Sequence, residues 1–257
     1  MTANFVDYHC HILPALDDGS VDMGESLRMA RILADFGFAA VHCTPHRIKG
    51  CYENDPERVV RATAALQTVL DEAGIPLRLI PGTEHYLDEF LIDQLGGALT
   101  AAASRYLLVE APFKSGPELV TAMAAGLHKR RLAPLIAHPE RCSAFDPPLV
   151  EEGGRGPFSF LAKKKKVPDM ADALILKLRD SGCRFQGNLG SFAGHYGSDI
   201  KERALLFLQH GVYSCVGSDA HRSERLASML AAGYDAVLAA VGEEAASRLL
   251  AGSDLTA

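Results

Sequence analysis

Strand-length apolar runs alternate with segments of helical periodicity along almost the whole chain, and this alternation restricts the fold more than any other feature. Repeated strand–helix units favour a parallel sheet covered by helices. Seven runs in this order predict an α/β fold of the parallel β/α barrel type. The predicted strands are residues 5–9, 39–43, 77–81, 106–110, 134–137, 183–188 and 213–217.

Helices are predicted between these strands from their capping residues. Asp22 is a suitable N-cap for the first helix, which should stop near Gly37. Asp55 precedes a proline at the first helical position of the second helix, and Gly74 marks its end. The remaining predicted helices are residues 115–131, 169–181, 198–211, 223–232 and 243–250.

The length of 257 residues predicts a single domain covering 1–257. Residues 142–168 depart from the alternation, because they contain paired prolines, paired glycines and four consecutive lysines, Lys163–Lys166. We expect an exposed insertion there. The lysines are interpreted as a solvated surface, with a docking patch for an acidic or phosphorylated partner as the alternative.

Composition excludes several classes of protein. The formal charge of −6 argues against nucleic-acid binding. The apolar runs are shorter than the roughly 20 residues of a membrane helix, so no membrane insertion is expected. Asp7 interrupts any signal-peptide core. The six cysteines form no C-x-x-C pair, so they are interpreted as buried thiols of a cytoplasmic protein.

Metal-ligand residues follow the predicted strands where these end. His9 and His11 form a His-x-His pair, and alternation along a strand directs both rings to one face. Barrel enzymes carry their working residues at strand ends. Clustered histidines and carboxylates suit manganese, iron or zinc, so the pattern predicts a site for several metal ions. Further candidates at strand ends are His46, Glu84, Glu110, His138, Asp219 and His221, and an Asp-Asp-Gly turn adds Asp18.

Seven motifs in a fixed order make the prediction more specific. The chain resembles the polymerase-and-histidinol-phosphatase (PHP) superfamily, and within it the bacterial tyrosine-protein phosphatases of capsule and exopolysaccharide operons, the CpsB/YwqE type. The resemblance spans residues 7–222. The motifs are DYHCHILPALDDG, CTPHR, PGTEHY, LLVEAPF, LIAHPERC, FQGNLGSFAGHYG and VGSDAHR.

This resemblance implies a distorted seven-stranded barrel of the PHP type that holds three divalent metal ions, manganese first, with iron or zinc as alternatives. Carried over by motif, the first ion has the ligands His9, His11, Glu84 and Asp219. The second shares Glu84 and adds Glu110 and His138. The third takes Asp18, His46 and His221, with Glu110 as a shared ligand.

The implied reaction is attack on phosphorus by a metal-activated hydroxide. Arg141 is expected to bind the phosphate as a bidentate fork, helped by Arg222 or Arg225. His46 and His221 are grouped with Arg141 as catalytic residues, and the general acid stays unassigned. The implied partner is a phosphotyrosine protein, namely the C-terminal tyrosine cluster of a bacterial kinase that controls polysaccharide synthesis.

Some nearby side chains receive predictions of their own. Asp7 is expected to orient a ligand histidine, and Asp17 to stabilise the Asp-Asp-Gly turn. His42 is interpreted as a core histidine, and His85 as a residue of the opposite strand face. His195 lies in a glycine-rich loop, either near the substrate or only in a turn. Phe113, Phe192 and Tyr196 are candidates to stack on a phosphotyrosine ring or to lie in the core.

Four alternatives are weighed against this prediction. A cysteine-dependent phosphatase needs an arginine six residues after its cysteine, and no cysteine here has one. An amidohydrolase also opens with His-x-His, but the Asp-Asp-Gly turn and the terminal Asp-x-His favour a phosphoesterase. Histidinol phosphate or a sugar phosphate remains open as a substrate, because loops select it. A non-catalytic scaffold would lack metal ligands. The oligomeric state is left open.

Overall fold

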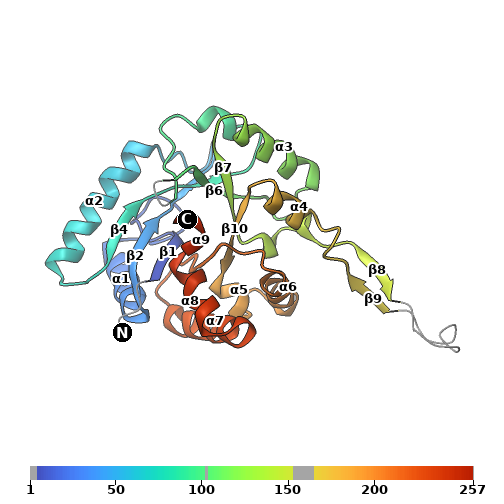
Figure 1. The fold of residues 1–257 in the computed structure, drawn as a ribbon. Helices are drawn as coiled ribbons and strands as arrows, with labels where there is room; N and C mark the ends of the chain where they lie inside the picture. The colour runs from blue at the N-terminus through green and yellow to red at the C-terminus, as the bar shows by residue number, and fades with distance from the viewer. Residues whose placement is uncertain (1–4, 102–103, 153–164, 257) are drawn as a thin grey trace, which may run out of the picture.

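The structure is a computed structural model that describes residues 5–101, 104–152 and 165–256. Helices alternate with mostly parallel strands along the chain (Figure 1). The strands are β1 (Phe5–Cys10), β2 (Phe38–Cys43), β3 (His46–Arg47), β4 (Arg78–Pro81), β5 (Glu84–Tyr86), β6 (Tyr106–Glu110), β7 (Ala133–Ala137), β8 (Leu149–Glu152), β9 (Lys165–Pro168), β10 (Arg184–Asn188) and β11 (Cys215–Gly217). The α-helices are α1 (Met23–Phe36), α2 (Pro56–Glu72), α3 (Pro117–His128), α4 (Leu174–Asp180), α5 (Leu189–Ala193), α6 (Ser198–Gln209), α7 (Leu226–Val241), α8 (Glu243–Ala251) and α9 (Ser253–Thr256).

Two parallel sheets carry the candidate site. One has the order β1-β2-β4 and the other the order β11-β10-β7-β6-β5-β3. Strands β2 and β3 are separated only by Thr44-Pro45, so one run of chain contributes to both sheets, and β4 and β5 repeat this arrangement across Gly82-Thr83. A parallel bridge between Cys10 and Ala220 joins β1 to the segment after β11. The strands therefore direct their carboxyl ends to a common edge.

Each of the seven predicted strands has a counterpart, whereas β3 and β5 were not predicted. These strands have the sequences His-Arg and Glu-His-Tyr, so neither contains an apolar run that a pattern search detects. Their pairing depends on each other, because His46 lies opposite Glu84 in the register. Both strands carry candidate ligands.

Local capping explains where the first two helices begin and end. The Asp22 carboxylate accepts a hydrogen bond from the Glu25 amide at 2.8 Å, and Gly37 closes α1 in the left-handed conformation. Asp55 caps α2 in the same way, with Pro56 as its first residue. The predicted end of the helix at 223–232 is wrong, because α7 continues to Val241.

The apolar faces of the helices and sheets share one large core that includes residues from Cys10 to Leu250. A second, smaller cluster contains Tyr8, Leu108, Leu135 and Cys215, and Leu255 of α9 packs against it. Each fully buried aliphatic or aromatic side chain contributes about 1.5–3 kcal/mol. Across the described residues, none of the helices is both long and apolar enough to span a membrane.

The segment predicted as an exposed insertion has two parts. Its first residues, Cys142, Ala144 and Phe145, are buried in the core. Its later part is an antiparallel hairpin of β8 and β9 that extends away from the rest of the molecule (Figure 1). Leu149 in this hairpin is 61% exposed. Lys163 and Lys164 lie outside the described residues, and Lys166 is exposed.

Candidate functional site

The nine predicted metal ligands lie together at the carboxyl ends of the parallel strands. They come from β1, β3, β5 and β6 and from the loops after β1, β7 and β11. Residues up to 212 positions apart in sequence meet there because every parallel strand ends at this edge. The nine residues, called the ligand cluster below, are His9, His11, Asp18, His46, Glu84, Glu110, His138, Asp219 and His221.

Glu84 is the central carboxylate of the ligand cluster and is 1% exposed. Its Oε2 lies 3.2 Å from Nε2 of both His9 and His11 and 3.0 Å from Nδ1 of His46. Its Oε1 lies 3.5 Å from Nε2 of His138. Among the described residues, neither oxygen accepts a hydrogen bond of normal geometry. A buried carboxylate needs positive charge beside it, so this donor set fits divalent cations.

Asp219 is the second buried carboxylate, and its two oxygens face different partners. Oδ1 lies 3.3 Å from Nε2 of His9 and 3.5 Å from Nε2 of His11. Oδ2 accepts hydrogen bonds from the Asn188 amide at 2.7 Å and from the Arg141 guanidinium at 3.1 Å. Asp219 therefore connects the histidines to Arg141, which contacts a carboxylate of the cluster directly.

The remaining ligands lie nearer the surface. Asp18 Oδ1 is 3.4 Å from Nε2 of His221 and 3.6 Å from Nε2 of His46. Glu110 Oε1 is 3.7 Å from Nε2 of His138. Four sets have ligand atoms within 4.8 Å of one another: His11, Asp18, His46 and His221; His9, His11 and Glu84; His9, His138 and Asp219; and His46, Glu84 and Glu110.

These geometric sets overlap with the assignment carried over by motif but are not identical to it. His11 joins the set that contains Asp18, whereas the motif assignment placed it only with the first ion. His138 is grouped with Asp219, although it also lies within 3.7 Å of Glu110. All nine side chains lie together, and His9, His11, His46 and Glu84 each belong to two of the four sets.

Electrostatics within the cluster favour cations. Burial opposes protonation of His9, but the charges of Glu84 and Asp219 outweigh it and raise its pKa to about 9. Burial would raise the pKa of Glu84, yet the facing histidines hold it well below its usual range. Burial and the Glu84 charge raise the pKa of Glu110. Protons and metal ions therefore compete for the same imidazole nitrogens.

Two side chains that orient ligand histidines were missed by the sequence prediction. Asp17 Oδ2 lies 2.7 Å from Nδ1 of His11 and also accepts the His46 amide at 2.8 Å. Gln186 Oε1 lies 2.9 Å from Nδ1 of His9. Each contact turns Nε2 of the ring toward the cluster. The sequence predicts only the turn contact of Asp17, which the Gly19 amide makes at 2.9 Å, and it marks Gln186 only as a residue near the end of a predicted strand.

The prediction that Asp7 orients the ring of a ligand histidine is wrong. Its carboxylate accepts the backbone amides of His9 and Ser218 and the Ser218 hydroxyl, so it joins β1 to the end of β11 without contacting an imidazole. His42 is a core histidine, as predicted, with its ring stacked on Tyr8 and burial lowering its pKa to about 4. Phe192 is fully buried and therefore belongs to the core.

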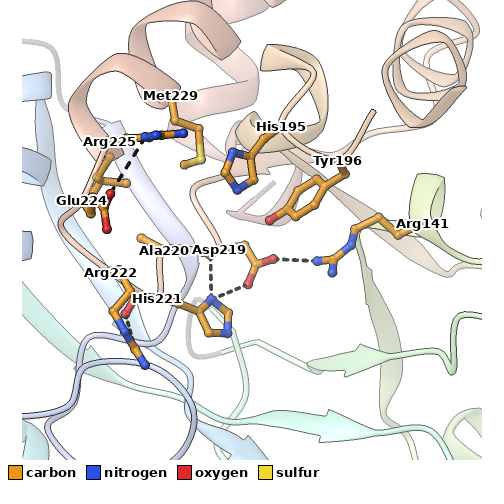
Figure 2. Close-up of a pocket in the computed structure, with 11 residues that line it drawn as sticks. Arg141, His195, Tyr196, Asp219, Ala220, His221, Arg222, Glu224, Arg225 and Met229 are labelled. Atoms are coloured by element: carbon orange, nitrogen blue, oxygen red, sulfur yellow. Dashed lines mark hydrogen bonds and ion pairs between the residues drawn. The ribbon is translucent and has the colours of Figure 1, made fainter. Parts of the chain in front are cut away.

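A cavity of about 320 Å³ opens beside Asp219 and His221 (Figure 2). Arg141 lies at one side of it, with its guanidinium carbon 4.5 Å from the ring centre of Phe113 and 4.2 Å from that of Tyr196. The two rings flank the guanidinium while one of its nitrogens donates to Asp219, and its remaining N–H groups can donate to an anion.

The two arginines predicted from the last loop differ from Arg141. Arg222 donates through one nitrogen to the carbonyl oxygens of Asp18, Gly19 and His221, so it holds the Asp-Asp-Gly turn. Arg225 has an 81% exposed side chain that approaches only Glu224, at 4.0 Å, among the described residues. Both arginines line the cavity (Figure 2).

Comparison with protein families identifies the chain. Residues 5–148 and 162–254 match the family model described as capsular polysaccharide synthesis, CpsB/CapC. The chain belongs to this family. The intervening residues 149–161, which include β8, lie outside the match.

Curated relatives and a solved structure support this assignment. The tyrosine-protein phosphatase YwqE of Bacillus subtilis is 30% identical over 218 residues, which are 84% of this chain and 77% of that protein. CpsB of Streptococcus pneumoniae is 24% identical over 251 residues, covering 95% and 94%. A crystal structure from work on YwqE and CpsB, described as unique metal-dependent tyrosine phosphatases, superposes with a TM-score of 0.79 at 28% identity, covering 98% and 94%.

Proposed function

We propose that this chain is a metal-dependent phosphatase that hydrolyses phosphotyrosine on proteins. The observation that carries the proposal is Glu84, a buried carboxylate without a normal hydrogen bond that is surrounded by four histidine nitrogens. That environment suits bound cations. The names of the relatives YwqE and CpsB favour phosphotyrosine over histidinol phosphate as the substrate.

The ligand cluster would hold three divalent ions, manganese first and iron or zinc as alternatives. When bound, such ions neutralise phosphoryl oxygens and acidify a water enough for attack at neutral pH. Histidine nitrogens with carboxylate oxygens are a donor set that these metals accept. Asp17 and Gln186 would keep Nε2 of His11 and His9 directed at the ions.

Arg141 would bind the phosphate. Its planar fork matches two phosphoryl oxygens, and the contact with Asp219 places it beside the ligand cluster. His46 and His221 would take part in catalysis as metal ligands, and His221 also lines the cavity. Arg222 and Arg225 would contribute less to phosphate binding, because the first is engaged with backbone carbonyls and the second is exposed.

The physiological substrate would be the C-terminal tyrosine cluster of a bacterial tyrosine kinase that controls capsule or exopolysaccharide synthesis. Support comes from the family's description as capsular polysaccharide synthesis. We place the reaction in the cytoplasm, in agreement with the six free cysteines.

For the fold, we propose a distorted seven-stranded barrel within one domain, residues 1–257. The Cys10–Ala220 bridge and the two runs of chain shared by the sheets support closure of the barrel. The core that extends from Cys10 to Leu250 supports one domain. An experimental structure in which β1 and β11 were separated would contradict the barrel.

The direct test is phosphate release from a phosphotyrosine peptide by the manganese-loaded protein, with and without a chelator. We expect release that the chelator abolishes and added manganese restores. Histidinol phosphate, assayed in parallel, should react much more slowly. Release that persists in chelator, or a preference for histidinol phosphate, would contradict the proposal.

A further inference from the structure

Phosphotyrosine hydrolysis leaves one chemical role unassigned, the supply of a proton to the departing tyrosine. A phenolate has a conjugate-acid pKa of about 10, so it takes up a proton at neutral pH. General acids typically contribute about 10²- to 10⁴-fold to such steps. The proton donor must line the cavity beside the ligand cluster, and its donor atom must not be engaged with residues of that cluster.

The cavity offers few side chains that meet these conditions. His221 has Nδ1 2.9 Å from the Asp219 carbonyl oxygen and Nε2 3.4 Å from Asp18, so both nitrogens are engaged. Burial raises the pKa of Tyr196 to about 12, which makes its hydroxyl a weaker acid than the departing tyrosine. Glu224 is 85% exposed and lies 4.0 Å from Arg225, so it is directed to solvent and to that arginine.

His195 remains, and its backbone is held in place. The His195 amide donates to the Gly190 carbonyl oxygen at 2.9 Å, and the Gly197 amide donates to the Gly194 carbonyl oxygen at 3.1 Å. Both flanking glycines have positive φ, 81° at Gly194 and 101° at Gly197, which other residues rarely adopt. The sharp turn that they form ends α5 and presents two consecutive side chains to the cavity.

The imidazole of His195 is directed into the cavity on the side that also carries Tyr196 (Figure 2). It packs edge-on against Tyr196, with ring centres 5.1 Å apart. Tyr196 in turn covers Arg141, the proposed phosphate ligand. The tyrosine end of a substrate whose phosphate meets Arg141 and the ligand cluster therefore lies within the part of the cavity that His195 borders.

We propose that His195 is the general acid, and this inference rests on the proposed phosphatase function. As the bond between phosphorus and the phenolic oxygen breaks, a ring nitrogen of His195 gives its proton to that oxygen. Water supplies the oxygen that forms the new bond to phosphorus. The products are the dephosphorylated tyrosine side chain of the substrate protein and inorganic phosphate, and the imidazole regains a proton from solvent.

The test compares wild-type protein with His195→Gln on aryl phosphates whose leaving phenols differ in acidity. We expect kcat/KM for phosphotyrosine to fall about 10- to 100-fold, because a phenolate of high basicity needs the proton. For 4-nitrophenyl phosphate, whose phenol is much more acidic, the variant should match the wild type. The loss should increase steadily as the leaving phenol becomes less acidic.

His210→Gln, an exposed histidine at the end of α6, is the matched control and should leave every substrate unchanged. Equal losses with all substrates would assign His195 a structural role, and an unchanged rate with phosphotyrosine would also overturn the inference. Tyr196→Phe keeps the ring contact and removes only the hydroxyl; a loss that grows with the basicity of the leaving phenol in this variant, and not in His195→Gln, would assign the proton donor to Tyr196 and overturn the inference. Failure of the phosphatase function itself would appear in the wild type.

Discussion

Two residues of the ligand cluster adopt backbone conformations that are uncommon outside glycine. His138 has a φ of 29° and Asp219 a φ of 50°. Such conformations cost about 1–3 kcal/mol and persist where surrounding contacts enforce them. The His138 amide donates to the Gln186 carbonyl oxygen at 2.8 Å, and the Asp219 amide to the His9 carbonyl oxygen at 2.8 Å. The two strained backbone positions are therefore also positions of predicted metal ligands.

We predict that His138→Ala removes activity while the chain still folds. His138 approaches Glu84, Glu110 and Asp219, so its loss takes a nitrogen donor from the centre of the cluster. Phosphate release should fall about 100-fold or more. Circular dichroism and thermal unfolding of metal-free protein should match the wild type. A folded variant with full activity would refute the ligand assignment.

Arg141→Lys tests whether the guanidinium fork matters beyond its charge. Lysine keeps the positive charge but cannot form the two parallel hydrogen bonds or present a planar group to the rings of Phe113 and Tyr196. Losing one charge-assisted hydrogen bond costs about 1.5–3 kcal/mol, that is roughly a 10- to 100-fold fall in kcat/KM. Arg130→Lys, an exposed residue in the turn after α3, is the control. Equal rates for Arg141→Lys and wild type would contradict the phosphate-binding role.

At the residue scale, the sequence predicted the ligand cluster but not the side chains that orient it. Ligands could be predicted because each follows a strand and belongs to a motif. The contacts of Gln186 with His9 and of Asp7 with Ser218 join positions 177 and 211 residues apart. A single sequence does not indicate which side chains far apart along the chain will come into contact.

At the scale of the elements, helices α5 and α7 pack closely against each other. A Cβ at Gly233 would lie 2.3 Å from the carbonyl oxygen of Leu189 in α5. Glycine inside a helix ordinarily weakens it, so the sequence favoured a helix ending at Ala232. The structure tolerates Gly233 because the absent side chain lets α5 pack against α7. Helix α5 follows Asn188, whose amide holds Asp219, so this packing supports the site.

Gly233→Ala should therefore destabilise the protein by about 1–3 kcal/mol, because the added methyl group meets backbone atoms that cannot move aside. Gly126→Ala in α3 is the matched control. Its Cβ would meet only the flexible end of Ile92 at 3.3 Å, so helix propensity should stabilise the variant by up to about 1 kcal/mol. Urea unfolding measures both changes. A stabilised Gly233→Ala would contradict the packing account.

The β8–β9 hairpin is predicted to be dispensable for catalysis. The Asp169 amide donates to the Pro148 carbonyl oxygen at 2.7 Å, so the two ends of the hairpin lie side by side. An isolated two-stranded hairpin adds little stability. Replacing residues 149–168 by two glycines should keep phosphotyrosine-peptide hydrolysis within about twofold of wild type. A large loss of activity with unchanged folding would show that the hairpin contributes to the site.

At the scale of the whole molecule, the site exists only when both sheets have formed. Its ligands come from positions 9 to 221 and from strands of both sheets. The order of the motifs predicted this assembly, because successive strand ends in a parallel β/α fold meet at one edge. The short strands β3 and β5, which complete the second sheet, could not be predicted, since their pairing is a property of the assembled sheet.

The most direct test of the account is to titrate metal-free protein with manganese while measuring bound metal per chain and phosphate release from a phosphotyrosine peptide. The account predicts up to three bound ions per chain, release that rises with occupancy, and no release from the metal-free protein. Binding should also stabilise the fold, by about 2.7 kcal/mol for each site at a hundredfold excess over its Kd. Full phosphate release from chains that carry no metal would contradict it.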